Sequence, residues 1–428
     1  MKVSRFDWDG QDPSALAAQI RALQPELGEV SEAVAEIIDA VREGGDRAVA
    51  ELEARFGGGS GSGTVRQPDD AISAAPSRLE GELVSALETA AANIEAVAEA
   101  QLADESEVRL EQGQSVALRE VPVASAGIYA PGGMAAYPST VLMGCIPAKV
   151  AGVGRVVLAT PPVSGDRQIP DIILAAAAIA GADEVYAMGG AQAIAALAIG
   201  TAGIPPVDVI AGPGNRYVQE AKRQLGGEVG IDGIAGPSEL MVIAGETAKS
   251  DWIALDLCAQ AEHGLDGLLV AAAVETVILD GIEESVARVA GERGVAEDAT
   301  LALVAVPDTA TAVTLANAIA PEHLEILTED ADLLAGTVTT AGCVFVGERS
   351  ATAFGDYAAG SNHVLPTGGA GRFQGPLGPG AFRRRIATVE ITQAAAEALA
   401  PTVATLARAE GFPLHAESVE TRARERGR

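Results

Sequence analysis

The segment "DLCAQAEHG" at residues 256–264 carries two side chains that could bind one metal ion. Gln260 and His263 are three residues apart, and residues at that spacing are neighbours on one face of a helix. An amide oxygen and an imidazole nitrogen are both donors that Zn²⁺ accepts. A polar edge of an exposed helix would have the same pattern, so the pair alone leaves both interpretations open.

The histidines of the chain are few and lie together in its last two-fifths, each with polar neighbours. The set comprises His263, His323, His363 and His415, with Gln260, Glu322, Asp356 and Glu410 beside them. Four histidines in such surroundings favour one shared site over four unrelated positions. Two imidazoles, one carboxylate and one amide oxygen can hold Zn²⁺ and leave it a net positive charge toward a substrate.

The adjacent pair Glu322–His323 in "APEHLEI" points to proton transfer. Neighbouring residues of a strand face opposite sides, but at a strand entry after Pro321 both side chains can turn toward one cleft. A carboxylate and an imidazole together can relay protons near neutral pH. Taken alone, the pair fits a polar loop before a buried strand equally well.

Glycine-rich turns suggest a second kind of site. "IYAPGG" (128–133), "AMGGAQ" (187–192) and "AGPGNRY" (211–217) each follow an apolar run, and backbone N–H groups of such turns can bind a phosphate or nucleotide. No G-x-G-x-x-G motif stands at the first of these turns, so the dinucleotide interpretation is weak on spacing alone. "IAGPSEL" (234–240) offers Ser238 as a turn hydroxyl.

The elements that must position these residues follow from the apolar pattern. Residues 31–56 and 76–102 have helical periodicity, with Ser77 and Glu80 in the spacing of a capping box. Residues 57–63, "GGGSGSG", are typical of a flexible loop. From about residue 126, short β-branched runs alternate with Ala-rich helical stretches, and residues 386–411 are predicted to be helical, broken by Pro401. This alternation predicts an α/β protein with two doubly wound, Rossmann-like parallel sheets and small helical segments at both ends.

Charge and composition exclude several partners. The 428 residues include 29 Lys and Arg against 59 Asp and Glu, a formal charge of −30 that disfavours nucleic acid and anionic membrane surfaces. The uncharged stretch 185–207 is rich in Gly, Ala and Pro and is predicted to be buried strand and helix rather than a membrane span. The first ten residues lack a signal-peptide pattern, and three scattered cysteines favour the reducing cytoplasm.

Together these motifs resemble one family closely, the histidinol dehydrogenases. The similarity runs in family order from about residue 20 and is carried by "GIYAPGGMAAYPSTVLMGCIPAKVAG", "MGGAQAIAALAIGT", "AGPGNRYVQEAKRQ", "AGPSE", "DLCAQAEHG", "PEHLEI", "GDYAAGSNHVLPTGG" and "AEGFPLHAESVETR". The loop at 57–63 is the main departure from the family pattern.

The resemblance implies a role for each candidate residue. It implies that one Zn²⁺ per subunit is held by Gln260, His263, Asp356 and His415, and that Glu322 and His323 are the acid–base pair. It implies NAD contacts at Tyr129, Gln192 and Asn215. Substrate contacts are implied at Ser238, His363 and Glu410, together with the metal-binding residues and His323.

The resemblance also implies oxidation of L-histidinol through L-histidinal to L-histidine, the last steps of histidine biosynthesis. Two hydride removals are then separated by addition of water. His323 would take the alcohol proton, and Glu322 would activate the water. A homodimer whose tail completes the partner's site is implied as well.

We expect four parts in the chain. These are an N-terminal segment (1–24), a discontinuous α/β domain with the zinc and acid–base residues (25–125 and 238–378), an α/β domain with the NAD-matching turns (126–237) and a helical tail (379–428).

Three other functions fit the residues less well. A related dehydrogenase for another polar alcohol would be expected to differ at Ser238, His363 or Glu410. A zinc hydrolase would not need the glycine turns, and Ala259 and Ile319 stand where an H-x-x-E-H motif needs histidine. A non-catalytic metal-binding protein would have no use for Glu322 and His323.

Overall fold

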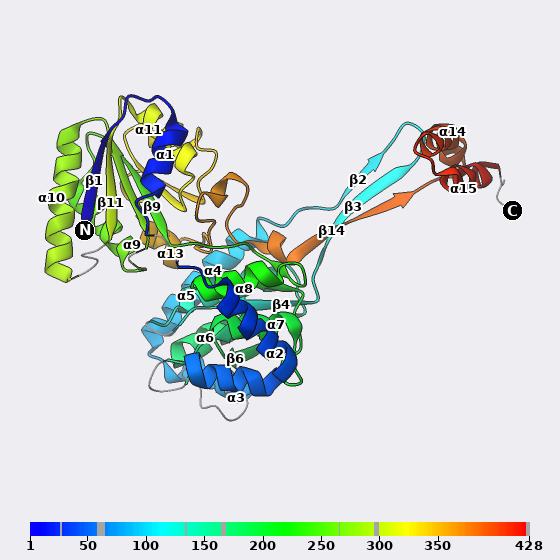
Figure 1. Cartoon of the computed structure of the whole chain (residues 1–428), viewed down its shortest axis with the longest axis horizontal. Coiled ribbons are helices and arrows are strands. Elements are labelled where there is room, and N and C mark those ends of the chain that lie inside the picture. Colours follow the sequence, from blue (N-terminus) through cyan, green and yellow to red (C-terminus); the bar gives the residue numbers. More distant parts are fainter. Residues whose placement is uncertain are drawn as a thin grey trace. The chain divides into compact units, whose positions relative to one another are not determined.

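The computed structural model describes residues 1–25, 28–57, 65–132, 135–163, 168–264, 266–294 and 299–424. The chain forms two compact units (Figure 1). The first contains residues 1–101 and 123–382, and the second contains residues 102–122 and 383–428. Apart from Gly57, the predicted loop at 57–63 lies outside the described residues.

The first sheet of the large unit has six parallel strands in the order β1-β11-β10-β9-β12-β13. Their bounds are β1 (Lys2–Asp7), β9 (Glu239–Ala244), β10 (Leu268–Ala273), β11 (Thr300–Ala305), β12 (His323–Leu327) and β13 (Cys343–Val346). The central strands are buried along their whole length, as expected for a parallel sheet covered on both faces.

Helices cover both faces of this sheet. One face packs against α1 (Pro13–Arg21), α11 (Thr309–Ile319) and α12 (Ala331–Ala335). The other packs against α9 (Ser250–Ala261) and α10 (Thr276–Arg293). A short helix, α13 (Thr352–Tyr357), follows β13. Two separate apolar cores therefore flank the strands, which confirms the doubly wound arrangement predicted for this part.

The second sheet of the large unit has five parallel strands in the order β6-β5-β4-β7-β8. Their bounds are β4 (Ser125–Tyr129), β5 (Arg155–Thr160), β6 (Glu184–Ala187), β7 (Val209–Ala211) and β8 (Gly230–Ile231). One face is covered by α2 (Ser31–Leu52), α7 (Gly190–Ile199) and α8 (Arg216–Leu225). The other is covered by α3 (Asp69–Ala74), α4 (Gly81–Glu99), α5 (Pro138–Val150) and α6 (Asp171–Ile179).

The grouping of the N-terminal third differs from the expected division. Residues 25–125 were expected with the sheet that carries the acid–base pair, but α2 packs against α7 and α8, and α4 packs against α5. The buried stripe of α2, which includes Val34, Ile38 and Val41, belongs to the core of the second sheet. Residues 2–7 instead form an edge strand of the first sheet, beside β11.

Local capping also differs from the expectation at residues 75–81. A 3₁₀-helix, η2 (Ala75–Arg78), ends before α4 begins at Gly81. The Ser77 hydroxyl donates to the carbonyl of Ala74, so it is not available to cap α4. The predicted capping box is therefore wrong. Three other short helices are η1 (Glu53–Gly57, a π-helix), η3 (Ala370–Arg372) and η4 (Pro379–Phe382).

The second unit pairs an antiparallel sheet with two helices (Figure 1). Its strands lie in the order β14-β3-β2, with bounds β2 (Ser106–Arg109), β3 (Ser115–Pro122) and β14 (Arg383–Glu390). The helices are α14 (Gln393–Ala409) and α15 (Pro413–Arg424). Helix in the tail was predicted, but residues 386–390 are strand, and α14 continues through Pro401.

The stretch at 185–207 contains the end of β6 and all of α7, as predicted. In the ranges that the structure describes, no helix combines the length and apolarity needed to cross a membrane.

Candidate active site

Glu322 and His323 lie at the start of β12, on the amino-terminal edge of the first sheet. His323 is the first residue of the strand and pairs in register with Leu240 of β9. Both residues are buried, with 6% and 3% of their surface exposed. Glu322 Oε2 and His323 Nδ1 are 3.4 Å apart. The strand entry therefore brings the two side chains together, as the sequence suggested.

The segment Ser238–Glu239, at the start of the neighbouring β9, holds both side chains. Glu322 Oε2 accepts hydrogen bonds of 2.8 Å from the Ser238 hydroxyl and from the Glu239 N–H. His323 Nδ1 lies 3.0 Å from the carbonyl oxygen of Glu239. Because a carbonyl only accepts, Nδ1 carries the proton in the neutral ring.

The other ring nitrogen of His323, Nε2, is the one that can exchange a proton with a substrate. Nε2 is buried and has no hydrogen-bond partner in the structure, and it lies 3.5 Å from Asp356 Oδ1. Burial lowers the pKa of His323, but the carboxylates of Glu322 and Asp356 outweigh it and leave the pKa well above its ordinary value. In its neutral form, an imidazole so placed can accept a proton from a substrate at Nε2, and the two carboxylates stabilise the imidazolium that forms.

Gln260 joins this group from α9. It is buried in the last turn of the helix, and its Nε2 donates to the Ser238 hydroxyl, which in turn donates to Glu322. His263 lies in the turn just beyond the helix and is exposed. Its N–H bonds the carbonyl of Gln260 at 3.2 Å, so the helical spacing of the two residues is retained.

His363 connects the first sheet to the helices of the second. Its Nδ1 donates to the carbonyl oxygen of Asp356 at 3.0 Å, and its Nε2 lies 2.9 Å from the hydroxyl of Thr140 in α5. Burial lowers the pKa of His363, so the ring is neutral at physiological pH. The structure thus places His363 beside Asp356 with both ring nitrogens already paired.

The proposed metal ligands are divided between the two units of the chain. Among the residues described, no three His, Cys, Asp or Glu side chains lie close enough together to hold a metal ion. Gln260, His263 and Asp356 belong to the large unit, and His415 belongs to the second unit with Glu410. His415 and Glu410 are both exposed. The donor types still suit Zn²⁺, with two imidazoles, one carboxylate and one amide oxygen.

The three residues matching NAD positions lie at one edge of the second sheet. Tyr129 ends β4, Gln192 lies in the first turn of α7, and Asn215 is the N-cap of α8. This is the carboxyl edge of the sheet, where open α/β sheets bind their ligands. The Tyr129 hydroxyl accepts from the Gly190 N–H at 3.1 Å, and burial raises the pKa of Tyr129 to about 12.

Two buried charged groups beside these turns were missed by sequence reasoning. Glu53 accepts hydrogen bonds from the Gly189 N–H (2.8 Å) and from Gln192 Nε2 (2.7 Å), and burial raises the pKa of Glu53. A lone acid at the end of a helix about 140 residues earlier carries no recognisable signal of this contact.

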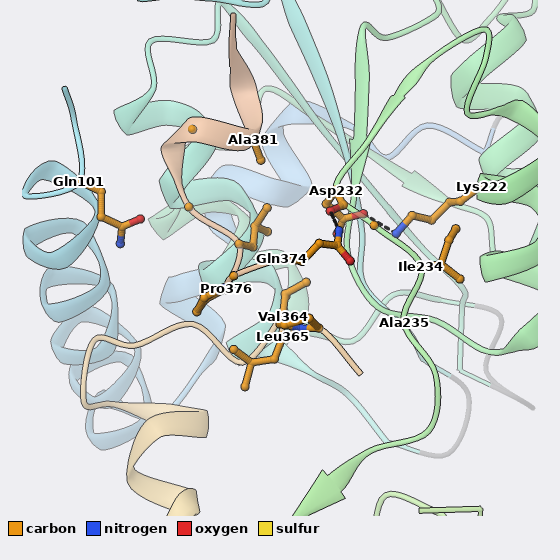
Figure 2. A pocket seen from close by; sticks show the side chains of 16 residues that line it. Gln101, Lys222, Asp232, Ile234, Ala235, Val364, Leu365, Gln374, Pro376 and Ala381 are labelled. Carbon is orange, nitrogen blue, oxygen red and sulfur yellow. Dashed lines mark hydrogen bonds and ion pairs between the residues drawn. The ribbon is translucent and has the colours of Figure 1, made fainter. Parts of the chain in front are cut away.

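The second missed group is an ion pair between Lys222 and Asp232, which face each other beside a cavity of about 260 Å³ (Figure 2). Lys222 Nζ donates to the Gly212 carbonyl at 3.1 Å, and Asp232 Oδ2 accepts from the Gly212 N–H at 2.8 Å. Gly212 has φ +123°, and a Cβ there would lie 2.1 Å from the carbonyl oxygen of Tyr129. Glycine is therefore required at this turn.

The fold and the buried Glu322–His323 pair define an α/β protein with a candidate acid–base site, and comparison with known proteins identifies its family. The family model for histidinol dehydrogenase matches residues 21–423. The chain belongs to the histidinol dehydrogenase family.

Individual relatives agree with this assignment. The chain is 40% identical to a histidinol dehydrogenase of Methylococcus capsulatus over 99% of both chains. It is 42% identical to one of Pseudomonas aeruginosa over 92% of this chain and 91% of the relative. The crystal structure of histidinol dehydrogenase from Elizabethkingia anophelis superposes with a TM-score of 0.91 at 30% identity, covering 99% of this chain and 98% of that one.

Proposed function

We propose that this enzyme oxidises L-histidinol through L-histidinal to L-histidine, using two NAD⁺ and one Zn²⁺ per subunit. The observation that carries the proposal is the geometry of His323, whose Nδ1 bonds a backbone carbonyl while its buried Nε2 makes no hydrogen bond and lies near Asp356. Family membership supports the reaction, because the relatives named above are histidinol dehydrogenases.

The first half-reaction requires a base at the alcohol. Oxidising a primary alcohol removes a hydride from carbon and a proton from oxygen. His323 takes the proton at Nε2, and the Nδ1–H bond to Glu239 keeps the ring in the orientation that exposes Nε2. Asp356, 3.5 Å from Nε2, stabilises the imidazolium that results.

The second half-reaction requires water. A second hydride can leave the aldehyde carbon only after water has added to it and formed the hydrate. Glu322 accepts the proton of the attacking water. Hydrogen bonds from Ser238 and the Glu239 N–H fix the position of one carboxylate oxygen of Glu322. Overall, one alcohol and one water give one carboxylate, two hydrides and three protons.

The proposal assigns binding roles to the remaining residues. Gln260, His263, Asp356 and His415 would hold Zn²⁺, and Tyr129, Gln192 and Asn215 would contact NAD. Zn²⁺ would supply a Lewis acid that orients the substrate, and NAD⁺ would supply the hydride acceptor. Ser238, His363 and Glu410 would contact the substrate, together with His323 and the metal-binding residues.

We further propose a homodimer in which the tail of one chain completes the site of the other. His415 and Glu410 lie in the small second unit, whose two helices and the turn between them expose Leu406, Phe412 and Leu414. Apolar side chains of this size on two short helices are typical of a surface that another chain covers. The three free cysteines support a reducing compartment, and we expect the enzyme in the cytoplasm.

The division of labour within the acid–base pair can be tested with two variants. His323→Ala should slow oxidation of histidinol strongly. Glu322→Gln should slow oxidation of supplied histidinal more than oxidation of histidinol. NADH formation from each substrate measures the two half-reactions separately. Equal losses of both half-reactions in both variants would contradict the assignment of one residue to each step.

A further inference from the structure

Glu239 holds both members of the acid–base pair through its backbone. It is the first residue of β9 and is 1% exposed. Its N–H donates to Glu322 at 2.8 Å, and its carbonyl accepts from His323 Nδ1 at 3.0 Å. A shift of this one residue would therefore displace the carboxylate of Glu322 and release the ring of His323 together.

The side chain of Glu239 is itself held at both oxygens. Oε1 accepts from Arg21 (2.8 Å) and from the Gly368 N–H (2.9 Å). Oε2 accepts from the other terminal nitrogen of Arg21 (3.2 Å) and from the Glu322 N–H (3.3 Å). Arg21 ends α1 and also donates to the carbonyl of Ile319, so it ties Glu239 to the segment that leads into β12.

The arrangement depends on the arginine. A buried carboxylate needs a compensating charge, and Arg21 supplies that charge through a two-pronged contact that fixes the orientation of the carboxylate. Glu239 and Glu322 each accept a hydrogen bond from the backbone N–H of the other, so the two strand starts are bonded reciprocally. Without Arg21, the Glu239 carboxylate loses a hydrogen bond at each oxygen and is no longer held in one orientation, which weakens this reciprocal contact.

We propose that Arg21 and Glu239 are positioning residues that hold Glu322 and His323 in reactive geometry. The proposal rests on the function proposed above. Neither side chain is assigned a contact with substrate, metal or NAD. Because both catalytic side chains bond the backbone of Glu239, losing Arg21 slows the alcohol step and the aldehyde step alike. Variants of His323 or Glu322 would each affect mainly one step.

The test compares Arg21→Met with Arg21→Lys and with a matched arginine on the other sheet. Arg155, like Arg21, pairs with one glutamate and donates to backbone carbonyls, and the two side chains are 23% and 22% exposed. Arg155 lies at the amino-terminal end of β5, at the opposite edge from the NAD-matching turns. Arg155→Met is therefore a control for the effect on stability and kcat of losing any such arginine–glutamate pair.

Arg21→Met should lower kcat of both half-reactions about 10- to 100-fold, as expected when reacting groups are misplaced by about 1 Å, with KM for histidinol changed less than about threefold. Arg21→Lys should recover part of kcat, because lysine keeps the positive charge but cannot donate to both carboxylate oxygens of Glu239 in the same bidentate geometry. Zinc content and the urea midpoint of unfolding are measured on every variant. Arg155→Met should keep kcat near that of the wild type.

If Arg21→Met unfolds, Arg21→Met/Glu239→Met replaces the buried pair by apolar side chains and restores stability. A stable double variant with low kcat supports positioning. A double variant whose kcat returns with stability overturns it, as does Arg21→Met with wild-type kcat in both half-reactions. If the wild-type enzyme does not reduce NAD⁺ when histidinol is supplied, the proposed function itself is refuted, rather than the positioning role of Arg21.

Discussion

Replacing Lys222 by Met should destabilise the protein by about 3 kcal/mol. The side chain is 1% exposed, and Figure 2 shows its amine directed at Asp232 beside the cavity. Methionine fills similar volume but leaves the carboxylate without a cation and the Gly212 carbonyl without its donor. Breaking a buried ion pair from one side typically costs about 3–5 kcal/mol because the remaining charge is uncompensated.

The lower end of that range is expected for a structural reason. Asp232 keeps its hydrogen bond from the Gly212 N–H. It also faces a cavity of about 260 Å³, which is large enough to admit water to the carboxylate that has lost its cation. Lys222→Met/Asp232→Leu removes both charges, so it should recover about 1–2 kcal/mol relative to the single variant. Full recovery is not expected, because the Gly212 N–H then lacks an acceptor.

Urea unfolding followed by far-UV circular dichroism at constant zinc measures these differences. Lys149→Met is the matched control, because Lys149 pairs with Asp183 near the same sheet but both side chains are about one-third exposed or more. Its loss should cost less than about 1 kcal/mol. If Lys222→Met costs no more than Lys149→Met, the reasoning about the buried pair is refuted.

Three further predictions concern the metal, the tail and pH. Chelation of zinc should abolish turnover while circular dichroism stays unchanged, and added Zn²⁺ should restore activity; full activity of metal-free protein would contradict the site assignment. Co-assembly of His323→Ala with His415→Ala should recover about a quarter of wild-type activity, since half the dimers are mixed and each has one intact site; no recovery in confirmed mixed dimers would place both residues in one chain's site. Burial, aided by the charge of Glu325, raises the pKa of Asp256 to about 7. Folding then favours the protonated form, so stability falls as pH rises from about 4 to about 7, and Asp256→Asn should gain more stability over the wild type at pH 8 than at pH 4.5 in urea unfolding.

Much of the fold could be predicted because the central strands of both parallel sheets are largely apolar runs. "ELMVIAG" and "HLEILT" became β9 and β12, and the helices between strands followed from their Ala-rich composition. The assignment of α2 and α4 to the second sheet was not predictable, because an apolar helix stripe does not say which sheet it covers. The strand at residues 383–390 forms by pairing with β3, a partner more than 260 residues earlier.

The candidate site was predictable where its polar residues are neighbours in the sequence. Glu322 and His323 are adjacent, and the structure places them together at the start of a strand. Glu239 stood within "AGPSE" but was not singled out, since an acid at a strand start has no helical or motif spacing. Arg21 and Glu53 reach their partners from helices far away in the sequence, and only the folded chain reveals those contacts.

The number of NADH molecules formed per histidinol tests the central claim most directly. Purified enzyme with zinc, excess NAD⁺ and a limiting amount of L-histidinol is followed by absorbance of NADH, and the products are separated by chromatography. The account predicts two NADH and one L-histidine for each histidinol consumed, because Glu322 and His323 serve successive steps at one site. One NADH per histidinol with accumulation of histidinal, or no NADH at all, would contradict it.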